Sequence, residues 1–394
     1  NGEKSAYSDW FNIISYDNPD TPENEFDYEG WYGIKDLAEF KENNDGPLPE
    51  IKNHFFSIVN RWMDPNNDGD PSDGIDGWRL DVAELVNINF WKEFNGWVKE
   101  INPDAYINGE VWWEDHQNNK MFNAAPWIQS DVFNSVMNYR FGDAAFKFFI
   151  DERKQVSAKK FDRLLHSVIK DYEYENVLHL QNMVDSHDTE RLATAIMNPD
   201  RWIDHDGGTW KNWDFRIQMP GKDERQIQKT IITLQFIYPG APLIYYGDEA
   251  GMWGADDPDC RKPMVWPGNT YDSEIAHPCD NLKDCDGKRP LNEVSFNDDI
   301  YNHYRDLIHI RKNNSALTHG TFKTTYINNR KKIISFERAY GNNRILSVFN
   351  GSKSEVELTD KMFPGKMENW KLIKGNETKI LKGKDANIFI ARKH

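Results

Sequence analysis

The chain has 394 residues, enough to bury a sizeable core and to form about two or three domains. Its 48 Lys and Arg residues against 64 Asp and Glu give a formal net charge of −16. Such an acidic surface argues against nucleic acids and anionic membranes as partners, because a phosphate-binding chain needs a basic footprint. No run of about 18 apolar residues occurs, so the sequence predicts no membrane span.

Helical and strand-like segments alternate from about residue 48 to residue 315. Helical spacing occurs over 48–63 and 89–101, and later in FDRLLHSVIKDY, IQKTIITLQFIY and IYNHYRDLIHIRK. Strand-like runs lie between these helices and end in polar residues, in GIDGWRLDVAEL, AYINGEVWW, HLQNMVDSHD and APLIYYGDE. The alternation predicts an α/β fold with a parallel sheet and crossover helices.

The pattern changes after about residue 315. Short strand-like runs, KKIISFERAY, RILSVFNGS, EVELTD, NWKLIKG and ANIFIARKH, are separated by turn signals such as GNN and NGS. They predict a C-terminal antiparallel β-sandwich over 316–394.

Carboxylates gather at the ends of the predicted parallel strands, where barrels of such strands carry their active groups. Arg79 and Asp81 are two apart on one strand and therefore face the same side. The guanidinium favours the ionised form of Asp81, which is the state that a nucleophile needs. Glu110 ends the next strand among apolar neighbours, which favour the protonated form of a carboxyl group. Retaining glycoside hydrolysis requires one carboxyl group in each state. A buried Arg79–Asp81 ion pair and a helix-capping Glu110 would fit the same spacing.

Several stretches resemble signature regions of the α-amylase family, glycoside hydrolase family 13. GIDGWRLDVAEL, INGEVWW and MVDSHDTER resemble three of these regions, and GAPLIYYGDEAGMWGADDPDCRKPMVW is similar to the stretch at the eighth strand. SAYSDWF and GWYG resemble the segment after the third strand in neopullulanases and cyclomaltodextrinases. The likeness runs from about residue 5 to residue 315.

The resemblance implies roles for single residues. Asp81 would form a covalent glucosyl-enzyme, and Glu110 would be the acid/base. Asp188 would bind hydroxyls of the distorted sugar, His187 would stabilise the transition state, and Arg79 would orient Asp81. The alternative for His187 is a satisfied core histidine.

Four further residues are candidates for contacts with neighbouring glucose units. Asp257 and Arg261 match the family's pattern beyond the eighth strand, although an exposed Asp/Arg pair is often a simple surface ion pair. Glu84 and Trp112 flank the predicted site, and packing alone would also explain them.

The implied fold is a (β/α)8 TIM barrel followed by the β-sandwich. Residues 1–47 would follow the third barrel strand, and 48–315 would supply about strands 4–8 with their helices. Nothing upstream of SAYSDWF resembles the first three strands. We therefore expect the native protein to include an N-terminal barrel segment that this chain lacks, because the barrel needs all eight strands to close.

The resemblance implies an enzyme that hydrolyses α-1,4-glucosidic bonds in maltooligosaccharides, cyclodextrins or starch-like glucans, with no organic cofactor. One alternative is an α-glucan transglycosylase on the same scaffold. The other is a non-catalytic glucan-binding protein, although such relatives are expected to lose the catalytic carboxylates that this chain keeps.

Two polar loops carry further predictions. Residues 64–76, DPNNDGDPSDGID, offer oxygen ligands at Asp64, Asn66, Asp68 and Asp70. The opening resembles a calcium-binding EF-hand loop, but Ile75 stands where that loop has Glu, so a structural Ca²⁺ and a solvated acidic turn are both open. Cys279 and Cys285 flank DNLKD and form either a small disulfide or two free thiols. A disulfide and a polymeric substrate would both fit a secreted or periplasmic protein.

Overall fold

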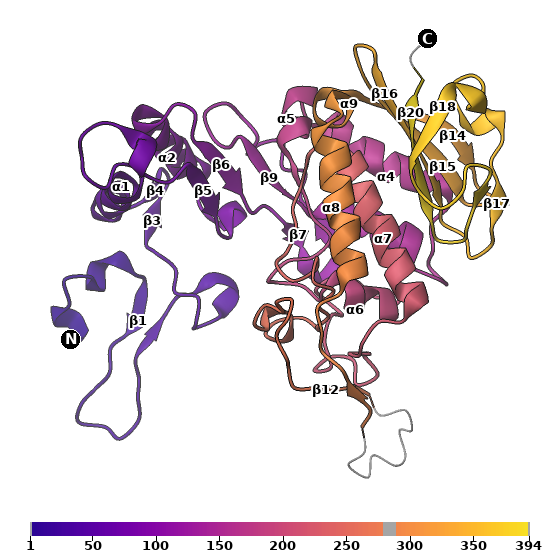
Figure 1. Ribbon diagram of the computed structural model, residues 1–394. Coiled ribbons are helices and arrows are strands. Elements are labelled where there is room, and N and C mark those ends of the chain that lie inside the picture. Colours follow the sequence, from indigo (N-terminus) through magenta and orange to yellow (C-terminus); the bar gives the residue numbers. More distant parts are fainter. Residues whose placement is uncertain (1, 279–288, 393–394) are drawn as a thin grey trace. The chain divides into compact units, whose positions relative to one another are not determined.

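The computed structural model describes residues 2–278 and 289–392 (Figure 1). The chain divides into two compact units, which are described separately below. The first unit contains Asn1–Trp112 and Phe122–Met137, and the second contains Trp113–Met121 and Asn138–His394. Cys279 and Cys285 lie outside the described residues, so their pairing stays a prediction. Within the described ranges, every helix is too short or too polar to cross a bilayer.

The first unit is organised around parallel strands. β5 (Gly77–Leu80) pairs in parallel with β6 (Tyr106–Gly109), and β6 pairs in parallel with β9 (Ser135–Asn138), whose last residue belongs to the second unit. Two helices, α1 (Pro49–Met63) and α2 (Ile88–Ile101), match the predicted ranges to within one residue. The predicted strand–helix–strand alternation is therefore confirmed in this unit.

Helix α2 shows how the sequence builds these elements. Asn87 caps its N-terminus by accepting a hydrogen bond from the Asn89 backbone N–H. Its large apolar residues recur every three or four positions and are buried on one side, as in Phe90, Phe94 and Val98. The N-terminal residues before α1 form only short pieces: β1 (Ile13–Ser15) with β2 (Asp27–Tyr28), and β3 (Glu42–Asn43) with β4 (Gly46–Pro47).

The second unit carries most of the helices. They are α3 (Tyr139–Ala145), which continues as a π-helical turn over Phe146–Ile150, then α4 (Ala158–Asp171), α5 (Tyr174–His179), α6 (Leu192–Met197), α7 (Lys222–Ile237), α8 (Asp298–Lys312) and α9 (Ser315–His319). The three helices predicted from sequence correspond to α4, α7 and α8. Short strands complete the unit outside its C-terminal sheet: β7 (Trp113–Asp115) with β8 (Lys120–Met121), parallel β10 (Gln181–Asn182) with β11 (Ala241–Pro242), and β12 (Glu274–Ile275) with β13 (Leu291–Asn292).

Strands β10 and β11 are shorter than the sequence suggests. Their ladder begins with the bond from Ala241 N–H to the Leu180 carbonyl, and the bond from Leu243 N–H to Asn182 is its last. His179, the first residue of HLQNMVDSHD, ends α5, and the residues after Asn182 and Pro242 leave the strands as loops. The polar residues that end each run thus lie in loops beyond the strand ends.

The C-terminal part forms two antiparallel sheets of unequal size. The larger has the order β14-β15-β16-β20-β18, and the smaller pairs β17 with β19. The strand bounds are β14 (Thr321–Asn328), β15 (Ile333–Tyr340), β16 (Asn343–Asn350), β17 (Val356–Glu357), β18 (Trp370–Lys374), β19 (Ile380–Leu381) and β20 (Ala386–Ala391). The predicted antiparallel strands are confirmed.

Side chains alternate between the two faces of the larger sheet, and both faces contribute residues to a hydrophobic core. Ile334, Phe349 and Ile388 belong to the core that includes residues of α4, α7 and α8, which lie beside this sheet in Figure 1. Leu346 and Phe389 point the other way and join the core under β17 and β19. One hydrophobic core thus includes residues from both sides of the predicted domain boundary at 315.

Arg338 of β15 connects this sheet to the helices through hydrogen bonds made inside the core. Its side chain is fully buried and donates hydrogen bonds to the carbonyls of Ile237, Gly320 and Thr321. Burial lowers the pKa of its guanidinium to about 10. One buried charged side chain therefore donates to three backbone carbonyls, of which that of Gly320 also accepts the Tyr174 hydroxyl at 2.7 Å.

We expect Arg338→Leu to lower the free energy of unfolding by about 3 kcal/mol, because the Ile237 and Thr321 carbonyls lose the donor that Arg338 supplies, whereas the Gly320 carbonyl keeps the Tyr174 hydroxyl. Urea denaturation followed by tryptophan fluorescence measures this. Arg330→Leu, at an exposed position of the neighbouring turn, is the matched control. Equal midpoints for the two variants would contradict a structural role for Arg338.

Candidate active site

The register of β5 and β6 brings two predicted carboxylates to one sheet edge. Leu80 is paired with Gly109 in a parallel ladder. The next residue on each strand, Asp81 and Glu110, therefore leaves the sheet at the same end. The backbone N–H of Glu110 donates to the Leu80 carbonyl at 2.9 Å, which extends the ladder to this point.

One guanidinium contacts both carboxylates. Arg79 forms an ion pair with Asp81 through Nη1, and its Nη2 lies 2.9 Å from Glu110 Oε1. The Asp81 side chain is 70% exposed, whereas that of Glu110 is only 8% exposed. The expected Arg79–Asp81 contact is therefore present, but it is an exposed pair and not the buried one of the alternative interpretation. The two carboxylates share a cation and differ strongly in their access to solvent.

The backbone after Asp81 is strained. Val82 has φ 45° and ψ 40°, a left-handed conformation that a β-branched residue rarely adopts. In this conformation its N–H donates to Glu110 Oε2 at 3.0 Å, and the next N–H, of Ala83, donates to the Glu110 carbonyl at 2.9 Å. Such strain is typical of functional sites, and here it turns the chain around Glu110.

The two flanking candidates of this unit contact each other. The Trp112 backbone N–H points at Glu84 Oε1 at 3.4 Å, and the Trp112 side chain is buried. Glu84 lies in the short helical turn Ala83–Leu85, directly after the strained residue. Their contact with a glucose unit stays a prediction.

A second group of predicted residues meets in the second unit. His187 Nε2 lies 3.1 Å from Asp188 Oδ2, and Arg261 Nη2 lies 3.2 Å from Asp188 Oδ1. Arg261 also pairs with Asp257 at 3.1 Å and donates from Nε to the His187 carbonyl at 2.8 Å. The His187 side chain is 43% exposed, so it is not a core histidine. Asp257 and Arg261 do form an ion pair, but the pair is joined to Asp188.

A buried charge network supports this second group, and sequence reasoning missed it. Arg191 is fully buried and pairs through Nη1 with Asp248 at 2.9 Å. Its Nε donates to the Cys260 carbonyl, next to Arg261. Asp185 accepts the Leu192 N–H at 2.7 Å, and burial raises the pKa of both Asp185 and Asp248. The sequence did carry a signal for this network. In the run D-S-H-D-T-E-R, charged residues flank S-H-D on both sides.

Three more carboxyl groups cluster behind Asp188. Burial raises the pKa of Glu190 to about 8, that of Asp204 to about 7 and that of Asp256 to about 6, and the mutual repulsion of these groups adds to the effect. Glu190 Oε2 accepts the Asp204 backbone N–H at 3.0 Å. Asp188 contributes further repulsion to Asp204 and Asp256, while Arg261 opposes it at Asp256. Of the three, Glu190 has its pKa raised furthest, so it is the group that most favours its protonated form.

Arg79, Asp81 and Glu110 belong to the first unit, whereas His187, Asp188, Asp257 and Arg261 belong to the second. Each group is assembled within its own unit. The complete catalytic triad of Asp81, Glu110 and Asp188 stays a prediction.

The predicted calcium loop makes internal hydrogen bonds. Asp64 accepts the N–H groups of Asp68 and Gly69 at 3.1 and 2.9 Å, and Asn66 also accepts from Asp68. Asp68 in turn accepts the Asp70 N–H at 2.8 Å. Over residues 2–278 and 289–392, no three His, Cys, Asp or Glu side chains are grouped as a metal ion would require. The turn is explained without an ion, and calcium stays a prediction.

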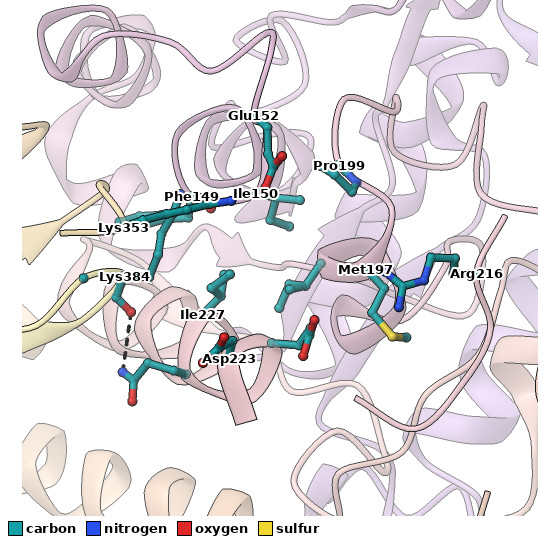
Figure 2. Close-up of a pocket in the computed structure, with 14 residues that line it drawn as sticks. Phe149, Ile150, Glu152, Met197, Pro199, Arg216, Asp223, Ile227, Lys353 and Lys384 are labelled. Carbon is teal, nitrogen blue, oxygen red and sulfur yellow. Dashed lines mark hydrogen bonds and ion pairs between the residues drawn. The ribbon is translucent and has the colours of Figure 1, made fainter. Parts of the chain in front are cut away.

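A cavity of about 470 Å³ lies elsewhere in the second unit (Figure 2). Its lining includes Ile150, Met197 and Ile227, with Lys384 at one side. Lys384 Nζ donates to the Phe149 carbonyl at 2.6 Å, and burial lowers the pKa of this amine to about 8. None of the predicted catalytic or glucan-binding residues lines this cavity, so its size does not identify it as the active site.

Comparison with known proteins identifies the same family that the sequence motifs resemble. Residues 1–320 match the family described as the α-amylase catalytic domain. Neopullulanase 2 of Thermoactinomyces vulgaris is 31% identical over 360 residues, which cover 91% of this chain and 49% of that protein. A cyclomaltodextrinase of Bacillus sp is 32% identical over 354 residues, which cover 90% and 50%.

Solved structures show the same likeness. A cyclomaltodextrinase superposes with a TM-score of 0.68 at 30% identity, over 99% of this chain and 54% of that one. The native debranching enzyme of Nostoc punctiforme superposes with a TM-score of 0.68 at 26% identity, over 99% and 71%. The chain spans about half the length of the two curated relatives named above.

The carboxyl cluster behind Asp188 predicts a pH dependence of stability. Folded Glu190 keeps its proton up to about pH 8, whereas unfolded Glu releases it near pH ~4.3. Between these values the folded state binds more protons, so this group's contribution to stability falls as pH rises.

We expect Glu190→Gln, which cannot ionise, to lose less thermal stability than the wild type between pH 5 and pH 8. Calorimetry at both pH values measures the two Tm shifts. Glu175→Gln on exposed α5 is the control, and parallel curves for all three proteins would contradict the prediction.

Calcium binding by the 64–70 loop can be tested separately. If the ion binds, millimolar CaCl₂ raises Tm, and Asp68→Asn removes the increase because it removes one ligand charge. An unchanged Tm would identify the loop as the acidic turn that its hydrogen bonds describe.

Proposed function

Because the chain belongs to the α-amylase family, we propose that it hydrolyses α-1,4-glucosidic bonds in maltooligosaccharides, cyclodextrins or starch-like glucans, with retention of anomeric configuration. The observation that carries the proposal is the shared contact of Arg79 with Asp81 and Glu110. The neopullulanase and cyclomaltodextrinase relatives support the substrate class. The activity of the whole protein is part of the proposal, since the chain covers about half of these relatives.

In the first step, Asp81 Oδ attacks the anomeric carbon while Glu110 gives a proton to the glycosidic oxygen. The carbon–oxygen bond breaks, and a glucosyl ester on Asp81 forms. Exposure of Asp81 supports this role, because the nucleophile must be open to the sugar. Arg79 orients Asp81 through their ion pair, and the Val82 N–H holds Glu110 from the other side.

In the second step, the Glu110 carboxylate takes a proton from water. The water oxygen bonds to the anomeric carbon, the ester bond to Asp81 breaks, and the sugar leaves with its original configuration. In the proposed mechanism Asp188 binds hydroxyls of the distorted sugar, and His187 stabilises the transition state. Arg261 supports Asp188 in this role, since its guanidinium contacts Asp188 Oδ1 and also donates a hydrogen bond to the His187 carbonyl.

The chain has the α-amylase catalytic-domain fold, a TIM barrel, within residues 1–320. We assign its parallel strands to about strands 4–8 of that barrel, on the order of the signature regions. Export to the periplasm or the medium remains a further prediction. The rival function, transglycosylation, differs only in whether a sugar hydroxyl replaces water in the second step.

We expect Asp81→Asn to lower kcat on maltoheptaose and β-cyclodextrin by a factor on the order of 10⁴, because the amide cannot form the ester. Released reducing sugar measures the rate in the full protein. Asp104→Asn, at an exposed position in the same unit, should retain wild-type activity. Full activity of Asp81→Asn would disprove the mechanism.

NMR of the first products tests retention, and products longer than maltoheptaose would favour the transglycosylase.

A further inference from the structure

Two tryptophans of the second unit lie on the surface. Trp210 is 71% exposed and Trp213 is 62% exposed. Both belong to residues 207–213, here called the tryptophan segment. Indole rings are usually buried in the core or at interfaces, so two exposed rings three residues apart are not explained by packing.

The tryptophan segment is attached to both stretches that carry predicted glucan-binding residues. The Gly207 carbonyl accepts the Asp256 N–H at 2.9 Å, and Gly207 N–H donates to Asp204. Asp204 N–H donates to Glu190. Glu190 follows Asp188 by two residues, and Asp256 precedes Asp257.

Gly207 packs closely against Glu190 and Asp256, so an added side chain would force its neighbours to shift. A Cβ at this position would lie 2.7 Å from Glu190 Oε2 and 3.2 Å from the Asp256 Cβ. The segment therefore begins in direct contact with the carboxyl cluster behind Asp188. The exposed rings continue from the predicted sugar site and are not an isolated surface feature.

The segment is also held in place before any ligand arrives. A Cβ on Gly208 would lie 2.3 Å from Trp210 Nε1, so the indole edge lies directly against the backbone. Asn212 N–H donates to the Gly208 carbonyl at 3.1 Å, and Lys211 Nζ donates to the His205 carbonyl at 2.8 Å. The Trp213 carbonyl contacts His277 Nε2 at 2.9 Å. Rigid aromatic side chains lose little conformational entropy on binding.

Polar rings lie next to the segment. The His205 ring lies tilted against the His116 ring, with ring centres 4.7 Å apart, and His116 Nε2 lies 3.4 Å from Asp204 Oδ2. Trp113 packs edge-on against His116, with ring centres 5.2 Å apart. Flat apolar rings beside imidazole and carboxylate groups match the chemistry of a sugar chain, which presents C–H faces and hydroxyls together.

We propose that the tryptophan segment is an additional binding site for the α-glucan chain, in which Trp210 and Trp213 stack on glucose units beyond those held at Asp188 and Asp257. The identity of the ligand rests on the proposed function. In this proposal the rings add affinity for long chains, which extend past the units held at Asp188, more than for short ones.

Binding without turnover tests this inference. In the Asp81→Asn background, isothermal titration compares maltoheptaose with maltotriose. We expect the double variant Trp210→Ala/Trp213→Ala to weaken maltoheptaose binding at least tenfold and maltotriose binding less than twofold. The variant Trp210→Phe/Trp213→Phe should keep most of the affinity, because it keeps the flat rings.

Trp62→Ala on α1 is the matched control, since Trp62 is also an exposed tryptophan, with 55% exposure, and belongs to the first unit. It should bind both sugars like its parent. Unchanged maltoheptaose affinity in the double alanine variant, with Tm equal to that of the parent, would overturn the proposal. So would equal losses for the two sugars.

Failure of the two proposals can be told apart. If the wild type releases no reducing sugar but the tryptophan variants lose maltoheptaose binding, the hydrolase proposal fails and the binding site stands. If the wild type hydrolyses maltoheptaose and the variants bind it normally, only the binding-site inference fails.

Discussion

The parallel pairing of β5 with β6 is the constraint on which the group of Arg79, Asp81 and Glu110 depends. Parallel strands end at a common edge, so the pairing of Leu80 with Gly109 brings the next residues, Asp81 and Glu110, to one edge. Arg79 can then reach both carboxylates with one guanidinium. A register shift of one residue would turn Arg79 and Asp81 together to the opposite face, and the contact of Arg79 with Glu110 would be lost.

Burial of charged side chains organises the group of His187, Asp188, Asp257 and Arg261 in the second unit. Arg191 and Asp248 are buried together, and the hydrogen bond from Arg191 to Cys260 joins the loop of Asp188 to the loop of Arg261. A buried ion pair stabilises a fold only modestly, but removing one partner leaves a costly charge behind. The network therefore makes the relative position of the two loops hard to change, which suits a site that must hold Asp188 in one orientation.

The carboxyl cluster and the tryptophan segment extend this arrangement outward. Glu190, buried behind Asp188, accepts a hydrogen bond from the chain that leads into residues 207–213. The same carboxyl groups that repel one another near Asp188 thus fix the start of an exposed aromatic surface. Electrostatics in the interior and sugar recognition at the surface are linked through a few backbone hydrogen bonds.

The sequence by itself determined the alternating strands and helices, the C-terminal antiparallel strands and the family. It also identified Asp81, Glu110 and Asp188 as candidates, because hydrophobic periodicity and short motifs are local properties of the chain. The contact of Arg261 with Asp188, the buried Arg191–Asp248 pair and the raised pKa values of Glu190 and Asp204 were decided only by the tertiary structure. Each of these features depends on burial or on contacts between residues distant in sequence. Local spacing along the chain reveals neither burial nor such contacts.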